Sequence, residues 1–485
     1  MPNPIDTISA DPQAELNLAH RHNALSEPYT LSGNHLLERQ QKRESNARSY
    51  PRRIPLALKR AHGIYVEDVE GRVFIDCLAG AGTLALGHNH RVVVEAIQQI
   101  LKDGLPLHTL DLTTPVKDRF VEDIFDALPA EFAKNAKIQF CGPTGSDGVE
   151  AALKLVKIAT GRGTMLSFQG AYHGMTQGAL QLMGSLNPKR PLNGSLHGVQ
   201  FLPFPYDYRC PFGLKGDAGI QANLNYIETV LTDPEGGVPL AAGMILEIIQ
   251  GEGGVIPAPD HWIQGIRKLT AQAGVPLIID EVQTGLGRTG KMFAFEHASI
   301  TPDVIVLSKA LGGSLPMSVV IYKDELDQWQ PGAHAGTFRG NQMAMAAGSA
   351  TLQHIRTEGL PHHAEQMGKR FMSQLNELRR DYPTIGDVRG RGLMIGVEIT
   401  DPENKNNTLG HPPAAPTIAA KIQAECLRYG LIVELGGRHG SVVRFLPPLV
   451  ITQQQIDKVF DIFSTAVHAV HHFPKINKPW AKNAA

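Results

Sequence analysis

Short apolar runs alternate with amphipathic stretches through the middle of the chain. The runs are rich in β-branched residues and bounded by Gly, Pro or Asp, a pattern typical of buried parallel strands. The predicted strands cover residues 137–140, 164–168, 199–202, 244–249, 275–280, 304–308 and 318–322. Helical periodicity is clearest at 148–160 and 261–273. This alternation predicts a large, doubly wound α/β domain with a mostly parallel sheet over residues 95–345.

The pattern differs on both sides of this region. GIYVEDVEGRVFID, at 63–76, alternates apolar and polar residues around Glu-Gly and predicts a β-hairpin. Residues 1–40 are polar with weak helical character, and this N-terminal extension is either a docked arm or a loosely held tail. Residues 346–485 predict a smaller α+β domain. Its expected helices cover 342–355, 363–380, 413–429 and 452–468, and its expected strands lie in RGRGLMIGVEI and GSVVRFLPPL.

Composition narrows the functional classes. The chain has 485 residues, with 46 Lys and Arg against 47 Asp and Glu, so its charge indicates no attraction to nucleic acid. No apolar run reaches the roughly 18 residues of a membrane span. The four cysteines (Cys77, Cys141, Cys210 and Cys426) are widely spaced, which predicts reduced, buried thiols. The polar N-terminus lacks the apolar core of a secretory signal and the arginines of a transit peptide, so we expect a cytoplasmic protein.

Two predicted strands end on a complementary pair of functional groups. The strand at 275–280 ends on Asp280, and Lys309 follows the strand at 304–308. The carboxyl ends of parallel strands line the ligand crevice of an open α/β sheet. There, Lys309 could form a Schiff base with an aldehyde cofactor, and Asp280 could keep a ring nitrogen protonated. Pyridoxal phosphate is therefore the first hypothesis.

A Gly-rich turn between a strand and a helix offers an anion site. In CGPTGSDG, at 141–148, turn amides and a helix N-terminus could hold a phosphate. The donors would come from Thr144, Gly145 and Ser146. The alternative is an ordinary helix cap by Ser146 or Asp147, with Glu150 as its partner. A P-loop is not expected, because no GK[ST] follows.

Several further side chains could take part in a site. Tyr172 follows the strand at 164–168 and could stack on a planar ring, or could be a surface residue. Glu247 and Glu252 flank a strand end and could orient a cofactor or a substrate amine. Paired carboxylates also suggest glycoside hydrolysis, but no other feature supports it. Arg444 lies in an apolar strand and needs a carboxylate partner, either from a substrate or from Glu252.

Two other motifs favour simpler interpretations. GLGRTG, at 285–290, matches a dinucleotide-binding pattern, but no helix onset follows and two carboxylates just before it would crowd a pyrophosphate. His88 and His90 lack further ligands at a metal-binding spacing, so no metal site is predicted. Thr337 presents a hydroxyl on a Gly-rich loop that leads into a helix.

Four segments in this order resemble the class III aminotransferases of fold type I, which use pyridoxal phosphate. They are EIIQGEGG, LIIDEVQTGLGRTGKMFAFEH, PDVIVLSKALGG and GTFRGN, and the resemblance extends over about residues 44–449. It implies a large doubly wound domain and a smaller α+β domain formed by both chain ends. Residues 41–94 would be the N-terminal segment of that smaller domain.

The resemblance also implies roles for the residues that bind the cofactor. Lys309 would be the Schiff-base lysine and proton shuttle. Asp280 would pair with the pyridine nitrogen and Gln283 with the ring hydroxyl. Tyr172 would stack on the ring, and Glu247 would support that region. Gly145 and Ser146 would hold the phosphate together with Thr337 of the neighbouring subunit, so the active site would require a homodimer or a higher oligomer.

The resemblance further implies how amino-acid and keto-acid substrates bind. Arg444 would bind the α-carboxylate of glutamate or 2-oxoglutarate, and Glu252 would neutralise Arg444 when an ω-amine enters. Met175 stands where several relatives acting on ornithine, acetylornithine or 4-aminobutyrate have Arg. YHGMT, ESNARSY, AGAGTLALGHN and LHTLDLTT resemble instead the branch that moves the 4-amino group of L-2,4-diaminobutyrate onto 2-oxoglutarate. Arg48 and Tyr50 are candidates for substrate contacts in that branch.

Three alternatives remain at this point. The chain could act on another ω-amine, such as ornithine, lysine, putrescine or 4-aminobutyrate. It could be an aminomutase, which would need no external keto acid. It could also be a binding protein on an inactive transaminase fold, although the presence of Lys309, Asp280 and Gln283 argues against that hypothesis.

Overall fold

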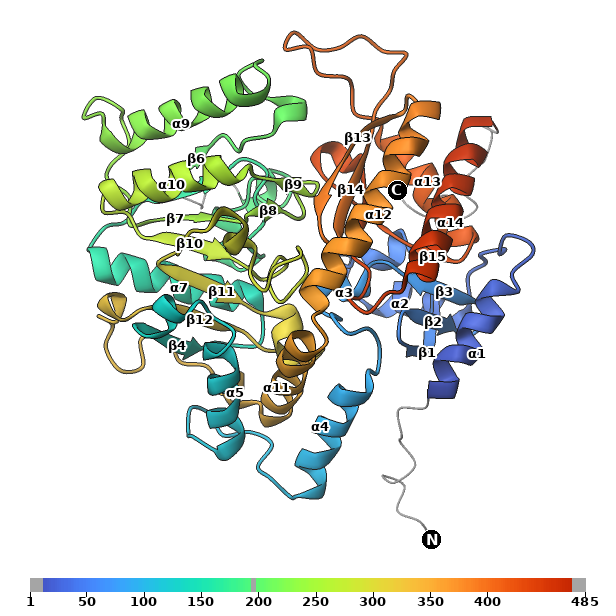
Figure 1. Ribbon diagram of the computed structural model, residues 1–485, viewed down its shortest axis with the longest axis horizontal. Coiled ribbons are helices and arrows are strands. Elements are labelled where there is room, and N and C mark those ends of the chain that lie inside the picture. The colour runs from blue at the N-terminus through green and yellow to red at the C-terminus, as the bar shows by residue number, and fades with distance from the viewer. Residues whose placement is uncertain (1–11, 193–197, 473–485) are drawn as a thin grey trace.

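A computed structural model of the chain describes residues 12–192 and 198–472 (Figure 1). In this part of the chain the largest sheet has seven strands in the order β4-β12-β11-β10-β7-β5-β6. They are β4 (Ala136–Phe140), β5 (Met165–Phe168), β6 (Val199–Leu202), β7 (Gly243–Leu246), β10 (Leu277–Asp280), β11 (Val304–Leu307) and β12 (Val319–Lys323). Only β12 runs antiparallel to its neighbours. All seven strands predicted from apolar runs are therefore confirmed.

One predicted strand ends early. The apolar run at 244–249 predicts a single strand, but β7 ends at Leu246. Ile248 and Ile249 are also buried, so the run continues as core after the strand has ended. Ile249–Gln250 (β8) instead pairs with Ile256–Pro257 (β9), and the turn between these two short strands carries Glu252. The prediction was wrong there because a buried turn has the same apolar composition as a strand.

Both faces of the large sheet are covered by helices. Along β10, Ile278 packs in the cluster that includes α7 (Gly145–Thr160). Its neighbours Leu277 and Ile279 pack in the cluster that includes α10 (Asp260–Gln272). Successive strand residues point to opposite faces, so strands that are buried throughout need apolar cover on both sides. This arrangement confirms the predicted doubly wound fold.

The predicted helices of the smaller domain are confirmed within a few residues as α11 (Gln342–Thr357), α12 (Leu360–Asp381), α13 (Pro416–Arg428) and α14 (Gln453–His472). The other long helices are α4 (Arg91–Lys102), α5 (Pro115–Phe125) and α9 (Gly216–Thr232). The alternative interpretation of the turn before α7, a cap by Ser146 or Asp147 with Glu150 as its partner, was wrong. Thr144 caps this helix by accepting from the Asp147 amide at 3.3 Å. Glu150 turns away and accepts from the Gly178 and Ala179 amides of α8 (Gln177–Gln181), a tertiary contact that local spacing does not encode.

The two ends of the chain meet in the smaller domain, where blue and red segments lie together in Figure 1. β1 (Leu58–His62), β2 (Tyr65–Asp68) and β3 (Val73–Asp76) form one sheet with β15 (Leu431–Ile432). The antiparallel β2–β3 pair confirms the predicted hairpin. α1 (Pro12–Asn23) docks beside it, with Leu18 buried and His22 hydrogen-bonded to the Gly430 carbonyl at 3.0 Å.

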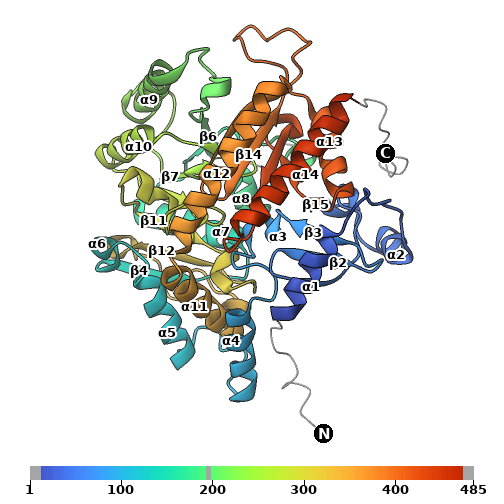
Figure 2. The same cartoon turned by 45° about the vertical axis from the view of Figure 1, so that its right-hand side comes forward.

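A second four-stranded sheet completes this domain. Its strands are β13 (Ile385–Arg391), β14 (Met394–Ile399), β17 (Val442–Phe445) and β16 (Glu434–Gly436), paired in that order. Figure 2 shows α12, α13 and α14 packed around it. Arg444 lies on β17 and Glu434 on β16, and the two residues face one another in register. This sheet therefore delivers charged side chains to the boundary with the large domain.

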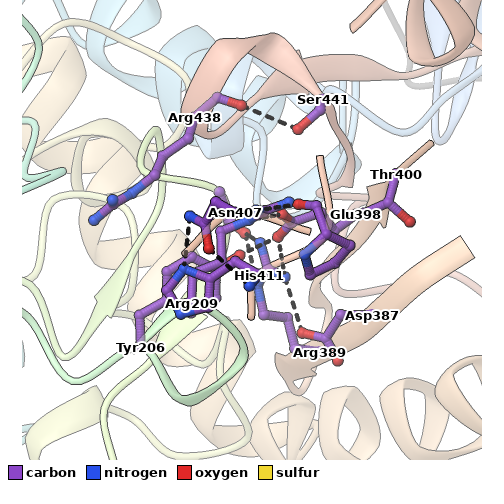
Figure 3. Close-up of polar contacts among 12 residues, drawn as sticks. Tyr206, Arg209, Asp387, Arg389, Glu398, Thr400, Asn407, His411, Arg438 and Ser441 are labelled. Atoms are coloured by element: carbon purple, nitrogen blue, oxygen red, sulfur yellow. Dashed lines mark hydrogen bonds and ion pairs between the residues drawn. The ribbon is translucent and has the colours of Figure 1, made fainter. Parts of the chain in front are cut away.

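An ionic cluster connects the two domains (Figure 3). Glu398 on β14 pairs with Arg389 of β13 at 2.7 Å and with Arg209 of the large domain at 2.5 Å, and Tyr206 donates its hydroxyl to the same carboxylate. Burial opposes ionisation of Glu398, but the two guanidinium charges outweigh it and lower the pKa of Glu398. Arg389 also donates to the Gly254 carbonyl at 2.7 Å. The cluster therefore braces the turn that carries Glu252.

All four cysteines are buried and unpaired, as predicted. Within residues 12–192 and 198–472, no helix combines the length and the apolar character needed to cross a bilayer.

Candidate active site

A cavity of about 240 Å³ opens where β10 and β11 end. Its walls bring together nine of the side chains or turn residues predicted from sequence: Tyr50, Gly145, Ser146, Tyr172, Glu247, Glu252, Asp280, Gln283 and Lys309. Arg444 lies directly behind Glu252 and Gln283. Thr337 begins the short helix η8 (Thr337–Gly340) and is not part of these walls. Arg48 donates to carbonyls of its own turn and does not line the cavity.

Lys309 lies in the cavity wall in a strained conformation. It begins the short helix η6 (Lys309–Gly312) with φ of +49°, a left-handed conformation that costs on the order of 1–3 kcal/mol for a residue other than glycine. Burial lowers the pKa of the Lys309 ammonium, although the charges of Asp280 and Glu252 oppose this effect. Burial therefore shifts Lys309 toward the neutral amine, which is the nucleophilic and basic form.

Asp280, the last residue of β10, has a buried partner. Its Oδ2 accepts a hydrogen bond from His173 Nδ1 at 2.8 Å, and its Oδ1 accepts from the Val282 amide at 3.0 Å. His173 is fully enclosed, and its Nε2 has no hydrogen-bond partner in the described chain. Sequence reasoning missed His173. The available signal was a strand-end carboxylate that required a buried donor, but the two residues are 107 positions apart, so local patterns could not identify the pair.

The N-terminus of α7 forms the wall made by Gly145 and Ser146. These are the first two residues of a 16-residue helix, so their amides have no acceptor within it and carry the positive end of its dipole. Ser146 Oγ accepts from the Met175 amide at 3.2 Å. A Cβ on Gly174 would lie 2.1 Å from Ser146 Oγ, so only glycine allows this close approach. The arrangement suits a bound anion.

Glu247 holds the loop that carries Tyr172. Its two carboxylate oxygens accept from the Tyr172 amide at 3.0 Å and from the Gly251 amide at 2.9 Å. Burial raises the pKa of Glu247 to about 7, and the nearby His173 opposes the rise. Glu247 therefore acts through the backbone of two loops, while the Tyr172 ring forms part of the cavity wall.

Arg444 is fully buried at the centre of a charged group. Its Nη1 lies 2.8 Å from Glu252 Oε1 and 3.2 Å from Glu434 Oε2, and its Nη2 donates to Gln283 Oε1 at 3.0 Å. Burial disfavours the charged guanidinium, but the two carboxylates outweigh this and raise the pKa of Arg444. Gln283 also donates its amide to the Ala81 carbonyl at 2.9 Å, which fixes its orientation.

Glu434 is a second residue that sequence reasoning missed. Its Oε1 accepts a hydrogen bond from the Tyr50 hydroxyl at 2.9 Å. Burial raises the pKa of Glu434, and the charge of Arg444 opposes the rise. A carboxylate within the apolar run LIVELGG was the available signal, since such a group requires a partner. That partner, Arg444, could be identified only from the pairing of β16 with β17.

Comparisons with known proteins agree with this geometry. The family description "Aminotransferase class-III" matches residues 46–467. A diaminobutyrate–2-oxoglutarate aminotransferase of Rhizobium meliloti is 59% identical over 430 residues, which are 89% of this chain and 92% of that protein. One of the same name from Haemophilus influenzae is 50% identical over 436 residues, covering 90% and 95%.

Solved structures show the same fold. An amine transaminase from an uncultivated Pseudomonas species, in its PLP-bound form, matches with a TM-score of 0.76 and 26% identity over 88% of this chain and 97% of the other. The ornithine aminotransferase of Toxoplasma gondii matches with a TM-score of 0.75 and 25% identity over 90% and 95%.

Proposed function

The chain belongs to the class-III aminotransferases, and we propose that it transfers the 4-amino group of L-2,4-diaminobutyrate to 2-oxoglutarate. The products are aspartate 4-semialdehyde and glutamate, formed in two reversible ping-pong half-reactions. The observation that carries this proposal is the close likeness, over nearly the whole chain, to two proteins named for that reaction. The lysine and carboxylate at the ends of β11 and β10 support it chemically.

The residues in the cavity fit pyridoxal 5'-phosphate, the cofactor of this family. When bound, this cofactor supplies an electron-withdrawing ring that stabilises negative charge on the substrate carbon. Lys309 offers the amine, and Asp280 offers a carboxylate fixed by His173. The two unpaired amides of Gly145 and Ser146 suit the phosphate. Tyr172 supplies an aromatic wall, and Gln283 supplies an amide beside it.

Lys309 carries the proton transfer. Its Nζ, whose pKa is lowered by burial, takes the proton from the carbon that bears the substrate amine. The hydrogen bonds from His173 and from the Val282 amide fix the Asp280 carboxylate, so it can face a positive group opposite it.

Arg444 and Glu252 let one site accept two kinds of substrate. An amine substrate needs no positive charge at this point, and the 2.8 Å pair with Glu252 masks Arg444. A keto acid brings a carboxylate that matches a guanidinium fork. The Glu252 side chain is 37% exposed, so it can leave Arg444 for solvent when 2-oxoglutarate enters.

The active enzyme is a homodimer in which Thr337 completes the phosphate site of the neighbouring subunit. Thr337 lies outside the cavity walls of its own chain. Apolar side chains beside it are exposed, with Phe338 at 60% and Leu112 at 70%, and a second subunit would cover them. Sedimentation at twice the 52.7 kDa of one chain is expected.

The four unpaired thiols support a reducing compartment, the cytoplasm, as the place of action.

Position-specific labelling tests the reaction. Diaminobutyrate with ¹⁵N at the 4-amino group should give labelled glutamate when 2-oxoglutarate is present, and diaminobutyrate labelled at the 2-amino group should give none. Labelled glutamate formed from diaminobutyrate that carries ¹⁵N at the 2-amino group would show that this group is transferred, and would contradict the proposed reaction. Rearrangement of the amine without 2-oxoglutarate would identify an aminomutase instead.

A further inference from the structure

A second cavity of about 320 Å³ adjoins the first and shares Tyr50, Tyr172 and Glu252 as a common wall. We propose that this second cavity recognises the amino-acid end of the substrate. The Tyr50 hydroxyl, oriented by Glu434, accepts from the α-ammonium, and Arg53 binds the α-carboxylate. The inference rests on the proposed function, because it assumes a substrate whose reacting amine lies opposite an amino-acid head.

Glu434 fixes the direction of the Tyr50 hydroxyl. The hydroxyl donates to Glu434 Oε1 at 2.9 Å, and Arg444 Nη1 lies 3.2 Å from the other carboxylate oxygen, Oε2. Because the hydroxyl hydrogen is used in this bond, the lone pairs of the hydroxyl oxygen are left for the cavity. Tyr50 therefore presents an acceptor to the substrate, which suits an ammonium group and repels a carboxylate.

Two carboxylates lie close together at the common wall of the cavities. Glu252 and Glu434 both pair with the single guanidinium of Arg444. Glu434 is 93% buried, and its Oε2 has no hydrogen-bond partner in the described chain. A substrate cation at the common wall, which Glu252 also lines, would lie close to both carboxylates. The α-ammonium of a diamino acid supplies that cation.

Arg53 supplies the complementary charge on the same cavity. It is exposed, donates only to the Leu435 carbonyl at 3.3 Å, and forms no ion pair within the described part of the chain. Its remaining N–H groups suit a carboxylate, which a guanidinium can bind through two hydrogen bonds. Met175, near Tyr172, offers no charge for this purpose. Arg53 is therefore the cation available to a substrate carboxylate here.

Two small amines separate the two contacts, because each lacks one group of diaminobutyrate. 1,3-Diaminopropane lacks the carboxylate, and 4-aminobutyrate lacks the α-ammonium. The experiment measures single turnovers of the holoenzyme with each amine, taking the apparent Kd and the limiting rate from the concentration dependence. The test variants are Glu434→Gln and Arg53→Gln. Glu425→Gln, a buried glutamate paired with Arg428, and Arg43→Gln on the exposed face of α2 (His35–Arg43) are the matched controls.

Glu434→Gln should raise the Kd for diaminobutyrate and diaminopropane roughly 10- to 100-fold. The Kd for 4-aminobutyrate should stay the same or fall. Arg53→Gln should raise the Kd for diaminobutyrate and 4-aminobutyrate and leave diaminopropane unchanged. Limiting rates should change little. This crossed pattern cannot arise from partial unfolding, which would affect all three amines alike.

Equal losses with all three amines would overturn the proposal and leave Glu434 a structural partner of Arg444. If Arg53→Gln leaves the Kd of every amine unchanged, Arg53 does not bind the α-carboxylate and that part of the proposal is wrong. The wild-type enzyme gives the separate check on function: if it fails to convert diaminobutyrate, the proposed reaction is wrong and the head-group assignment falls with it.

Discussion

Arg444 Nη1 lies 2.8 Å from Glu252 Oε1, although the two residues are 192 positions apart in the chain. Arg444 is on a strand of the smaller domain, and Glu252 is on the turn that follows the central sheet of the large domain. The pair therefore exists only when the two domains are correctly packed. It also gives one cavity two electrostatic states, with the guanidinium either masked or exposed.

Arg444→Ala should damage the two half-reactions unequally. The 2-oxoglutarate half-reaction should slow by on the order of 100-fold or more, because a charge-assisted carboxylate contact is lost. The diaminobutyrate half-reaction, in which Arg444 is masked, should be less affected. Single-turnover rates of both half-reactions, measured on the same folded preparation, check this. Equal losses would contradict the switch.

Lys309→Ala should bind the cofactor but lose turnover, by on the order of 1,000-fold or more, because both the nucleophile and the proton carrier are removed. Partial rescue by added ethylamine is expected, since a small amine can occupy the space left by the side chain. Cofactor absorbance and steady-state kcat report the two properties separately. Appreciable turnover without added amine would contradict the role of Lys309.

Asp280→Asn should lower kcat by roughly 100- to 1,000-fold, because a fixed negative charge at the reacting centre is lost. His173→Ala should have a smaller effect, since Asp280 keeps the hydrogen bond from the Val282 amide. The pH profile of kcat should also shift in His173→Ala, because the partner of Asp280 is gone. An unchanged profile would show that His173 has no part in positioning this carboxylate.

Glu281→Gln should change the pH dependence of stability. Burial raises the pKa of Glu281 to about 7, above its usual 4.5. Between these values the unfolded chain is ionised while the folded chain retains the proton, so the wild type loses stability as pH rises from 4.5 to 7. The loss is on the order of 3 kcal/mol above pH 7.

The glutamine variant lacks this titration and should gain stability relative to the wild type between pH 5 and pH 8. Urea unfolding midpoints at both pH values check the result, with Glu122→Gln on the exposed face of α5 as the control. Parallel pH dependence of Glu281→Gln and wild type would contradict the assignment.

The large sheet could be predicted because each strand is a short apolar run that ends on turn residues, and Asp280 and Lys309 follow from where two such runs stop. The antiparallel direction of β12 could not be predicted, because an antiparallel strand in a buried sheet has the same composition as its parallel neighbours. The end of β7 was missed for a similar reason, since Ile248 and Ile249 stay buried beyond it.

Charged partners were the least predictable part of the site. Glu252 could be matched with Arg444 through the family resemblance, but His173 and Glu434 were missed. Each of these two residues has a polar partner far away in the chain, 107 positions for His173 and Asp280 and 384 positions for Glu434 and Tyr50. Local patterns show that a buried charge needs a partner, but only the folded backbone identifies which one.

The most direct test of the central claim is a single-turnover titration of the holoenzyme with candidate amines, followed by the absorbance of the bound cofactor. L-2,4-Diaminobutyrate should convert the cofactor fast, and ornithine and 4-aminobutyrate should convert it slowly. Fast conversion by another amine without conversion by diaminobutyrate would keep the aminotransferase chemistry and contradict the proposed substrate. No cofactor absorbance, even after pyridoxal phosphate is added, would contradict the enzyme assignment itself.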